Sequence, residues 1–206
     1  STSSAASDVY KRQEEQRVVV FLEPIALYMT KDLIETGDGL WTFPYVEPEK
    51  ATPIKLGDIG IHGEGKELAI VTYGNGYYLS RQVEHDLAQQ GIKTRVIDLR
   101  WLAPLNEEAI LEAVADCEHI LIVDECRKTA SISEAIFTLF AENSEKLTAN
   151  ISCIDRICAE DSFIPLGSAS YTVLPSRASI LETALQLVNK QEKLGDLAQE
   201  KEAANV

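Results

Sequence analysis

The stretch LAIVTYGNGYYLSRQVEHDLAQQGIKTRVIDLR, residues 68–100, decides the fold. It opens with a short apolar run, Leu68–Val71, passes through a glycine turn into a helical pattern that ends at Gly91, and closes with a second apolar run at 94–99. Three apolar residues fall on one face of the predicted helix: Leu79, Val83 and Leu87. Short, continuously apolar strands that alternate with helices are typical of a sheet covered on both faces. The stretch therefore predicts an open α/β sheet.

The following residues continue the same alternation. Asn106 can cap a helix over 107–115, and residues 120–123 form a third apolar strand. Further on we expect a helix over 131–142, a strand over 150–157, an irregular loop over 161–175 and a last helix capped by Ser176. Five residues of the 131–142 helix are expected to face inward: Ile132, Ala135, Ile136, Leu139 and Phe140. The unit repeats strand and helix often enough to indicate the α/β class.

The residues before this unit read differently. RVVVFLE, residues 17–23, predicts a buried strand with no neighbouring strand to satisfy its backbone, so we expect its neighbours to lie on a part of the protein that precedes this sequence. Residues 24–32 suggest a helical turn, and 54–61 a short strand. Between them, Gly, Asp and Pro interrupt three rings that need a surface to pack on: Trp41, Phe43 and Tyr45.

Composition excludes several classes of function. Apolar residues make up 45% and charged residues 25%, as in globular domains. The net charge of −14, without clustered Lys and Arg, argues against nucleic acid as a partner. No apolar run approaches the roughly 18 residues of a membrane span, so no membrane partner is expected. The four cysteines form no C-x-x-C pair, which indicates reduced thiols in a cytoplasmic protein.

Two glycine motifs invite a ligand interpretation. Gly74-Asn75-Gly76 after a strand, with Asp98 ending the next strand, is similar to part of a dinucleotide fingerprint, but Leu79 stands where the third glycine belongs. Gly37-Asp38-Gly39 is similar to the opening of a thiamine diphosphate motif, but the downstream Asn is absent. We interpret both as turns.

The titratable residues form no convincing catalytic group. Asp124-Glu125 at a strand end could be an acid/base pair, or a surface or interface ion pair with Arg127 and Lys128. Three histidines are scattered along the chain: His62, His85 and His119. No catalytic, cofactor-binding or metal-binding residue is therefore assigned.

Several segments stand in a distinctive order. They are FLEPIALY (21–28), GKELAIVTYGNG (65–76), GIKTRVIDLRWLAPLNEEAI (91–110), HILIVDE (119–125) and IPLGSASYTVLPSRASIL (164–181). In this order they resemble beta-type subunits of thiamine-dependent 2-oxo acid dehydrogenases, over roughly residues 14–190. VIDLRWLAPLN is the most specific piece, and GDGLWTFPY resembles a linker in chains where alpha-type and beta-type parts are fused.

The resemblance implies a fold and a division of the chain. The expected fold is a three-layer α/β/α domain with a mixed, mostly parallel five-stranded sheet, similar to the C-terminal domain of transketolase and deoxyxylulose-phosphate synthase. Residues 1–13 would be a disordered or foreign leader, 14–53 the end of a pyrimidine-binding domain plus linker, 54–190 the transketolase C-terminal-like domain, and 191–206 a polar tail.

The resemblance also implies a function. The chain would be a fragment of the decarboxylating component of a pyruvate or branched-chain 2-oxo acid dehydrogenase, and this domain would serve subunit association. The parent enzyme would use thiamine diphosphate and magnesium, with neither bound by this chain alone. Its partners would be the upstream pyrimidine-binding and alpha-type domains, a second copy, and a lipoyl acyltransferase core. Two alternatives stay open: a transketolase-type or deoxyxylulose-phosphate synthase-type transferase, and a binding module without catalysis.

Overall fold

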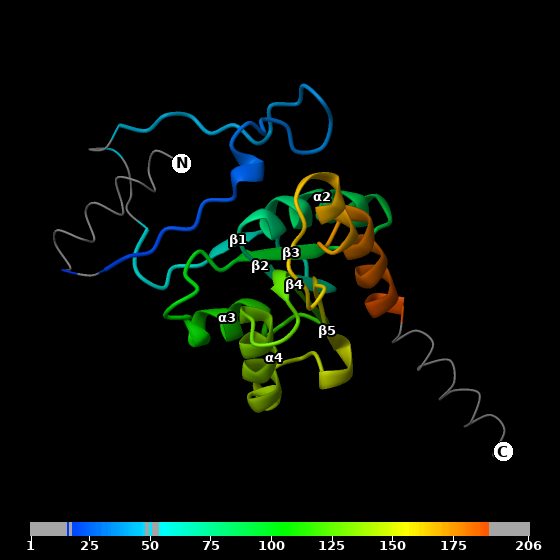
Figure 1. Cartoon of the computed structure of the whole chain (residues 1–206). Coiled ribbons are helices and arrows are strands. Elements are labelled where there is room, and N and C mark those ends of the chain that lie inside the picture. The colour runs from blue at the N-terminus through cyan, green and yellow to red at the C-terminus, as the bar shows by residue number, and fades with distance from the viewer. Residues whose placement is uncertain (1–15, 17, 48–49, 51–53, 190–206) are drawn as a thin grey trace, which may run out of the picture.

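A mixed five-stranded sheet forms the middle of the molecule (Figure 1). The computed structural model describes residues 16, 18–47, 50 and 54–189. The strands lie in the order β1-β3-β2-β4-β5, with β1 antiparallel to β3 and every other neighbouring pair parallel. Their bounds are β1 (Gly60–His62), β2 (Leu68–Thr72), β3 (Thr94–Asp98), β4 (His119–Arg127) and β5 (Ile154–Ala159). The expected mixed, mostly parallel sheet of five strands is confirmed.

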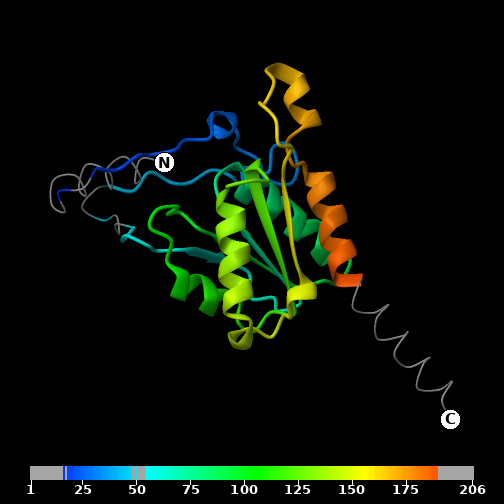
Figure 2. The same cartoon turned by 60° about the horizontal axis from the view of Figure 1, so that its bottom comes forward.

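Helices cover both faces of this sheet, which gives the three expected layers (Figures 1 and 2). Helices α3 (Glu107–Val114) and α4 (Ile132–Glu142) lie on one face. Helix α2 (Asn75–Gln89) and a C-terminal helix over 177–189 lie on the other. Short 3-10 helices add η1 (Ile25–Leu27), η3 (Ser144–Lys146), η4 (Ile151–Cys153) and η5 (Gly167–Thr172).

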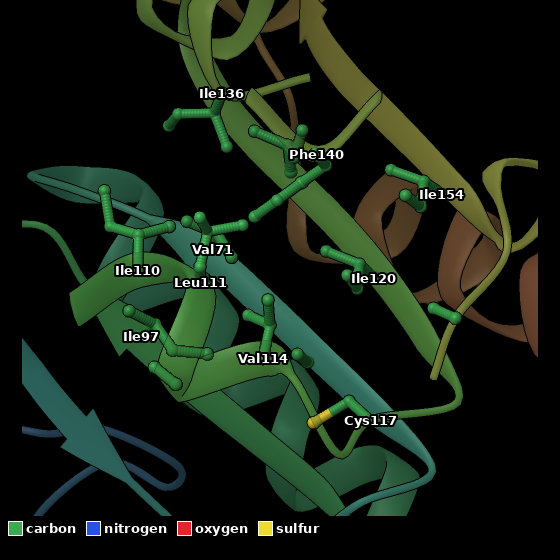
Figure 3. Packing of buried hydrophobic residues seen from close by; sticks show 14 of the residues in the cluster. Val71, Ile97, Ile110, Leu111, Val114, Cys117, Ile120, Ile136, Phe140 and Ile154 are labelled. Carbon is green, nitrogen blue, oxygen red and sulfur yellow. The ribbon is translucent and has the colours of Figure 1, made fainter. Parts of the chain in front are cut away.

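The strands divide their side chains between two cores. In β2, Ala69 and Val71 point toward α3 and α4, whereas Leu68 and Ile70 point toward α2 and the C-terminal helix. The first core is shown in Figure 3, where Ile97 from β3 meets the helix side chains, among them Val114. Because both faces of the strands are buried, the strands read as continuous apolar runs in the sequence.

The helix ends follow the predicted chemistry. Gly91 has φ +84°, and the Ile92 N–H donates to the Leu87 carbonyl at 3.0 Å, so a left-handed residue terminates α2. The Asn106 side chain accepts from the Ala109 N–H at 3.1 Å at the start of α3. Ser176 accepts from the Ser179 N–H in the same way before the C-terminal helix.

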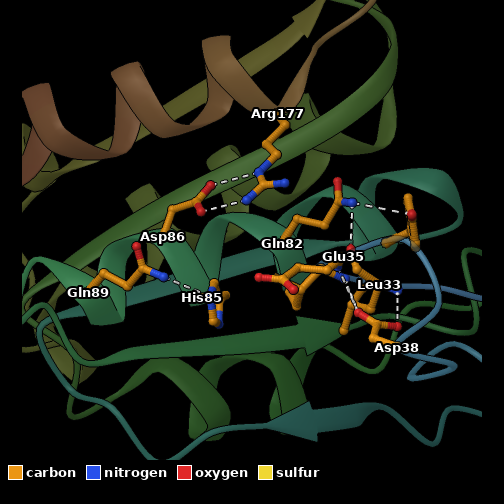
Figure 4. A network of polar contacts seen from close by, with 10 residues as sticks. Leu33, Glu35, Asp38, Gln82, His85, Asp86, Gln89 and Arg177 are labelled. Atoms are coloured by element: carbon orange, nitrogen blue, oxygen red, sulfur yellow. Dashed lines mark hydrogen bonds and ion pairs between the residues drawn. The ribbon is translucent and has the colours of Figure 1, made fainter.

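The loop over 31–43 packs on the outer side of α2. Gln82 donates to the Leu33 carbonyl at 2.6 Å, as Figure 4 shows, and the Tyr78 hydroxyl donates to the Asp32 carbonyl at 2.9 Å. The Trp41 ring lies 5.0 Å from the Tyr78 ring, centroid to centroid. The expectation that aromatic residues of this stretch need a surface is confirmed for Trp41, but Phe43 and Tyr45 remain exposed.

Several details of the predicted elements are wrong, among them the strand predicted over 54–61, which begins only at Gly60. The described part of the 17–23 stretch forms no strand, and Val18 and Val20 are 97% and 81% exposed, because no described strand lies beside it. The strand predicted over 150–157 begins only at Ile154, after a 3-10 turn that uses the preceding residues. Ala135 is exposed on α4, since the buried face of that helix is formed by Ser133, Ile136, Leu139 and Phe140.

Among the described residues, no helix has both the length and the apolar content needed to cross a lipid bilayer. The predictions for 1–13 and 191–206 lie outside the described residues, and the predicted domain boundary at 53/54 stays a prediction.

Ile97 tests the assignment of β3. Its side chain has no exposed surface, so Ile97→Ala should lower the free energy of unfolding by about 2–5 kcal/mol through lost burial and a cavity. Lys93 is exposed just before the strand, and Lys93→Ala should change the free energy of unfolding by less than about 0.5 kcal/mol. Urea melts of both variants measure the difference, and equal losses would contradict the assignment.

Candidate functional site

The connections of the sheet reverse direction at β2. The chain leaves β2 through α2 to reach β3 on one side, and then returns through α3 to β4, which pairs with the other side of β2. In open α/β sheets, ligands bind beyond the carboxyl ends of the strands at such a reversal. Here Tyr73 follows β2 directly, and Asp124 and Glu125 lie near the end of β4. This carboxyl edge is therefore the place where a site is expected.

Asp124 is the centre of a buried hydrogen-bond network at this edge. Asp124 is only 1% exposed. One carboxylate oxygen accepts from the Tyr73 hydroxyl at 2.6 Å and from the Cys126 N–H at 2.8 Å, and the other accepts from the Ser133 N–H at 2.9 Å. The carboxylate thus joins the ends of β2 and β4 to the first turn of α4.

Hydrogen bonding decides the charge state of this network. Burial is the largest influence on Asp124 and would raise its pKa, but the donors from Tyr73, Cys126 and Ser133 outweigh it and hold that pKa below its usual range. Burial, followed by the hydrogen bond to Asp124, raises the pKa of Tyr73 far above that of a free phenol. The pair is therefore a carboxylate bound to a neutral phenol, which suits a structural role.

The ion-pair interpretation of Asp124 fails in the described part of the chain. Its partners are neutral groups, and the Arg127 guanidinium donates to the Thr129 carbonyl instead. Glu125 points to the opposite face of β4, beside the first turn of α2. Its Oε1 atom is buried without a hydrogen-bond partner among the described residues. Burial raises the pKa of Glu125, against the effect of the Asn75 side chain, so this carboxyl is easier to protonate than Asp124.

The Gly74-Asn75-Gly76 turn serves close packing. Gly74 has φ +57°, and a Cβ added to Gly76 would lie 2.3 Å from the Thr72 hydroxyl oxygen. Both glycines are thus required by the turn from β2 into α2. Asp98, the acidic residue of the supposed dinucleotide motif, lies near Arg100 with 3.6 Å between Oδ2 and Nε, and burial raises its pKa. These observations agree with the interpretation as a tight turn.

The Gly37-Asp38-Gly39 motif is a turn closed by carboxylates. Asp38 accepts from the backbone N–H groups of Leu33, Ile34, Glu35 and Leu40, at 2.7–3.0 Å. Asp32 accepts from those of Gly37 and Gly39. Desolvation would raise the pKa of Asp38, but its four donors together lower it well below the usual range. Because both carboxylates are used by the backbone, the interpretation as a turn is confirmed.

The remaining candidates lie apart. His62 is near Glu84, with 3.4 Å between ring nitrogen and carboxylate oxygen, and His119 contacts the Glu67 carbonyl at 2.9 Å. His85 forms a hydrogen bond with Gln89 at 2.9 Å (Figure 4). Within the described ranges, no three His, Cys, Asp or Glu side chains form a group that could hold a metal ion. All four cysteines are free, and Cys126 is the exposed one.

Exposed apolar side chains flank the carboxyl edge, a feature that sequence reasoning found only in part. We call residues 18–29 and 163–171 together the apolar edge; in Figure 2 η1 and η5 lie above the sheet, and residues 18–23 run away from it to the left. Its large exposed side chains are Val18, Val20, Phe21, Leu22, Ile25, Tyr28, Met29, Phe163, Ile164, Leu166 and Tyr171. The apolar letters in FIPL (163–166) were visible in the sequence, but nothing there showed that Phe163, Ile164 and Leu166 would be exposed.

Fold and site together define an α/β domain with a buried hydrogen-bond network at its carboxyl edge. A family model described as "Transketolase, C-terminal domain" matches residues 57–170, more than half of the chain. The chain belongs to the transketolase C-terminal domain family.

Curated relatives narrow the comparison. The beta subunit of the pyruvate dehydrogenase E1 component of Bacillus subtilis (strain 168) is 29% identical over 171 residues, which cover 82% of this chain and 48% of the relative. The beta subunit of an acetoin:2,6-dichlorophenolindophenol oxidoreductase of Cupriavidus necator is 30% identical over 138 residues, 66% of this chain and 40% of the relative. The chain spans about half the length of the curated relatives it matches.

A solved structure agrees with the fold. An inactive β4 tetramer of a split-gene transketolase superposes with a TM-score of 0.58 at 16% identity, over 70% of this chain and 46% of that chain. At this identity the likeness concerns the fold alone.

The Asp124 network predicts a pH-dependent effect of Tyr73→Phe. The pKa of Asp124 is lowered in the folded protein. Its hydrogen bonds therefore stabilise the fold fully above the pKa of the unfolded carboxyl, near 4. That stabilisation is lost as the pH falls through the pKa of Asp124 in the folded protein. Tyr73→Phe should cost about 1.5–3 kcal/mol at pH 7, as for a hydrogen bond to a charged group. The cost should shrink in acid, where Asp124 is protonated.

Urea melts at pH 7 and in acid measure this effect. Tyr171→Phe is the matched control, since that ring is 80% exposed and should change the stability by less than about 0.5 kcal/mol at either pH. A cost at Tyr73 that does not vary with pH would mean that Asp124 stays neutral.

Proposed function

We propose that this chain is part of the decarboxylating component of a 2-oxo acid dehydrogenase, and that the domain described here holds subunits together. The whole protein would decarboxylate a 2-oxo acid, of pyruvate or branched-chain type, with thiamine diphosphate and magnesium. The relatives named as E1 beta subunits support this assignment over a transketolase-type transferase. The free cysteines support a cytoplasmic location.

The apolar edge is the observation that carries the proposal. Single exposed apolar side chains are ordinary on a protein surface, but many large ones on two segments of one domain indicate a surface for another protein. The extended residues 18–23 would add the backbone groups of a strand, which suit pairing with the edge of another sheet. The proposed partners are the pyrimidine-binding and alpha-type parts of the enzyme, a second copy, and an acyltransferase core.

The carboxyl edge supports a role in contact rather than in chemistry. Asp124 and Tyr73 hold each other in the states that are poorest for proton transfer, a bound carboxylate and a neutral phenol. Asp38, which would have to bind magnesium in a thiamine diphosphate motif, has its carboxylate occupied by four backbone donors. These groups give no support to a cofactor site in the described residues.

Self-association is the first test. Sedimentation of the full chain should show oligomers that dissociate on dilution, and the double variant Phe163→Asp, Leu166→Asp should be monomeric, because charge at the centre of an apolar contact prevents its desolvation. Ser144→Asp with Thr148→Asp adds the same charge at exposed polar positions and should leave the oligomers unchanged. A monomeric wild-type chain, or equal behaviour of the two doubles, would count against the association role.

Cofactor binding is the second test. Titration calorimetry of the folded chain with thiamine diphosphate and magnesium should show no heat beyond dilution, since no described residue is assigned to either. Circular dichroism establishes that the sample is folded. Tight binding that requires magnesium would mean that this chain contains the cofactor site. It would refute the proposal that the domain holds subunits together without binding the cofactor.

A further inference from the structure

Two of the four cysteines lie on neighbouring strands at the carboxyl edge of the sheet. Cys126 is exposed near the end of β4, and Cys158 is half-buried in β5. The other two, Cys117 and Cys153, are buried in the core that the sheet forms with α3 and α4. Exposure therefore makes Cys126 the thiol that a reagent in solution reaches first.

An irregularity in the pairing of β4 with β5 brings Cys126 and Cys158 to adjacent positions. Asp124 pairs with Cys158, but Arg127 pairs with Ala159, so three steps along β4 match one step along β5. In a regular ladder Cys126 would stand two residues beyond Cys158, and the bulge moves it back toward that cysteine. Neighbouring strands lie about 4.8 Å apart, and disulfides join Cα atoms roughly 4.4–6.8 Å apart. Residues at adjacent positions of paired strands can therefore be joined.

Both thiol groups also contact the hydrogen-bond network of Asp124. Cys126 Sγ lies 3.5 Å from the Tyr73 hydroxyl oxygen, and Cys158 Sγ lies 3.2 Å from the Ser133 hydroxyl oxygen. Tyr73 and Ser133 donate to the two oxygens of this one carboxylate. Each sulfur is therefore one side chain away from the same carboxylate, and both thiols lie on the side of the sheet that α4 covers.

Basic side chains gather at this end of the two strands, although the chain carries a net charge of −14. They are Arg127, Lys128 and Arg156. The Arg156 guanidinium donates to the Lys128 carbonyl at 3.1 Å, which fastens the loop after β4 to β5. The acidic residue that meets this loop, Asp161, accepts from the Thr129 N–H and hydroxyl. Basic surroundings attract reagents with carboxylate groups and favour the thiolate form of a cysteine.

Burial gives the two thiols different roles. It is the main influence on Cys158 and raises the pKa of that thiol, although the Ser133 hydrogen bond opposes it. Cys158 is therefore protonated and shielded from reagents until a reactive sulfur lies beside it. An accessible thiol next to a second, resolving thiol is the arrangement of redox-sensing cysteines.

We propose that Cys126 and Cys158 are a reversible redox pair, which a small disulfide with carboxylate groups converts into an internal disulfide. The Cys126 thiolate attacks one sulfur of the reagent, breaks its S–S bond and releases one thiol. The Cys158 thiolate then attacks the Cys126 sulfur and releases the second thiol. The two cysteines lose two electrons and two protons, which the reagent gains as it becomes two thiols. This site does not depend on the association role proposed above.

The first test treats the full folded chain with oxidised glutathione. After denaturation, N-ethylmaleimide should label two fewer thiols than in the untreated chain, and tryptic digestion without reductant should give a peptide pair that joins Cys126 to Cys158. A reducing agent should reverse both changes. This readout uses the wild-type chain and needs no variant to fold. No reaction, glutathione that stays on Cys126, or a disulfide between two chains would each overturn the proposal.

Variants separate the roles of the two thiols. Cys158→Ser should stop at a mixed disulfide, with one glutathionyl group on Cys126, because no thiol resolves it. Cys126→Ser should slow the loss of thiols about tenfold or more, because the attacking thiol is absent. Cys153→Ala is the matched control, since that thiol is buried and takes no part in the reaction. Equal slowing by Cys126→Ser and Cys153→Ala would overturn the assignment.

The basic side chains have a test of their own. Arg127→Gln with Lys128→Gln should slow the reaction with oxidised glutathione about threefold more than the reaction with uncharged hydroxyethyl disulfide. Lys55→Gln with Lys93→Gln removes the same charge at exposed positions elsewhere and should change either rate by less than about twofold. Equal effects of the two double variants would refute the selection of a reagent with carboxylate groups.

Discussion

The constraint on which the structure depends is the complete burial of β2. A strand with no solvent on either face needs hydrogen-bonding neighbours on both sides and apolar layers above and below. Parallel neighbours require long crossovers, which here become α2 and α3 on opposite faces. The three layers, the two cores and the position of Tyr73 at the reversal of the connections all follow from placing this one segment at the centre.

The same burial separates two carboxylates that are adjacent in sequence. Successive residues of a strand face opposite sides, so Asp124 turns toward α4 and accepts from three donors. Glu125 turns toward α2, and one of its buried oxygens has no partner in the described part of the chain. The Asp124-Glu125 dipeptide looks like a catalytic pair, but its two carboxyl groups lie in different environments. Asp124 forms structural hydrogen bonds, whereas Glu125 does not share them. The difference comes from the pleat of β4 rather than from the chemistry of the side chains.

The sequence was most informative where local rules and tertiary packing agree. Apolar runs and helix ends at Gly91 and Asn106 were predicted correctly, because caps and buried strands have strong residue preferences. The 17–23 stretch has the composition of a strand but no partner in the described structure, and composition cannot supply one. The bonds of Asp124 were also beyond prediction, since Tyr73 is distant in sequence and meets Asp124 only through the sheet register, and Ser133 is brought to it by the turn from β4 into α4.

The loop over 31–43 has a consequence for how another molecule would meet this domain. Two carboxylates, Asp38 with four backbone donors and Asp32 with two, order the loop from within, and Gln82 and Tyr78 fasten it to α2. A segment that has already lost its conformational freedom during folding has little more to lose on contact. The segment at 18–30 is thus followed by a loop that is fixed on α2. If another subunit bound this segment, α2 and the sheet would limit the orientations that the subunit could take.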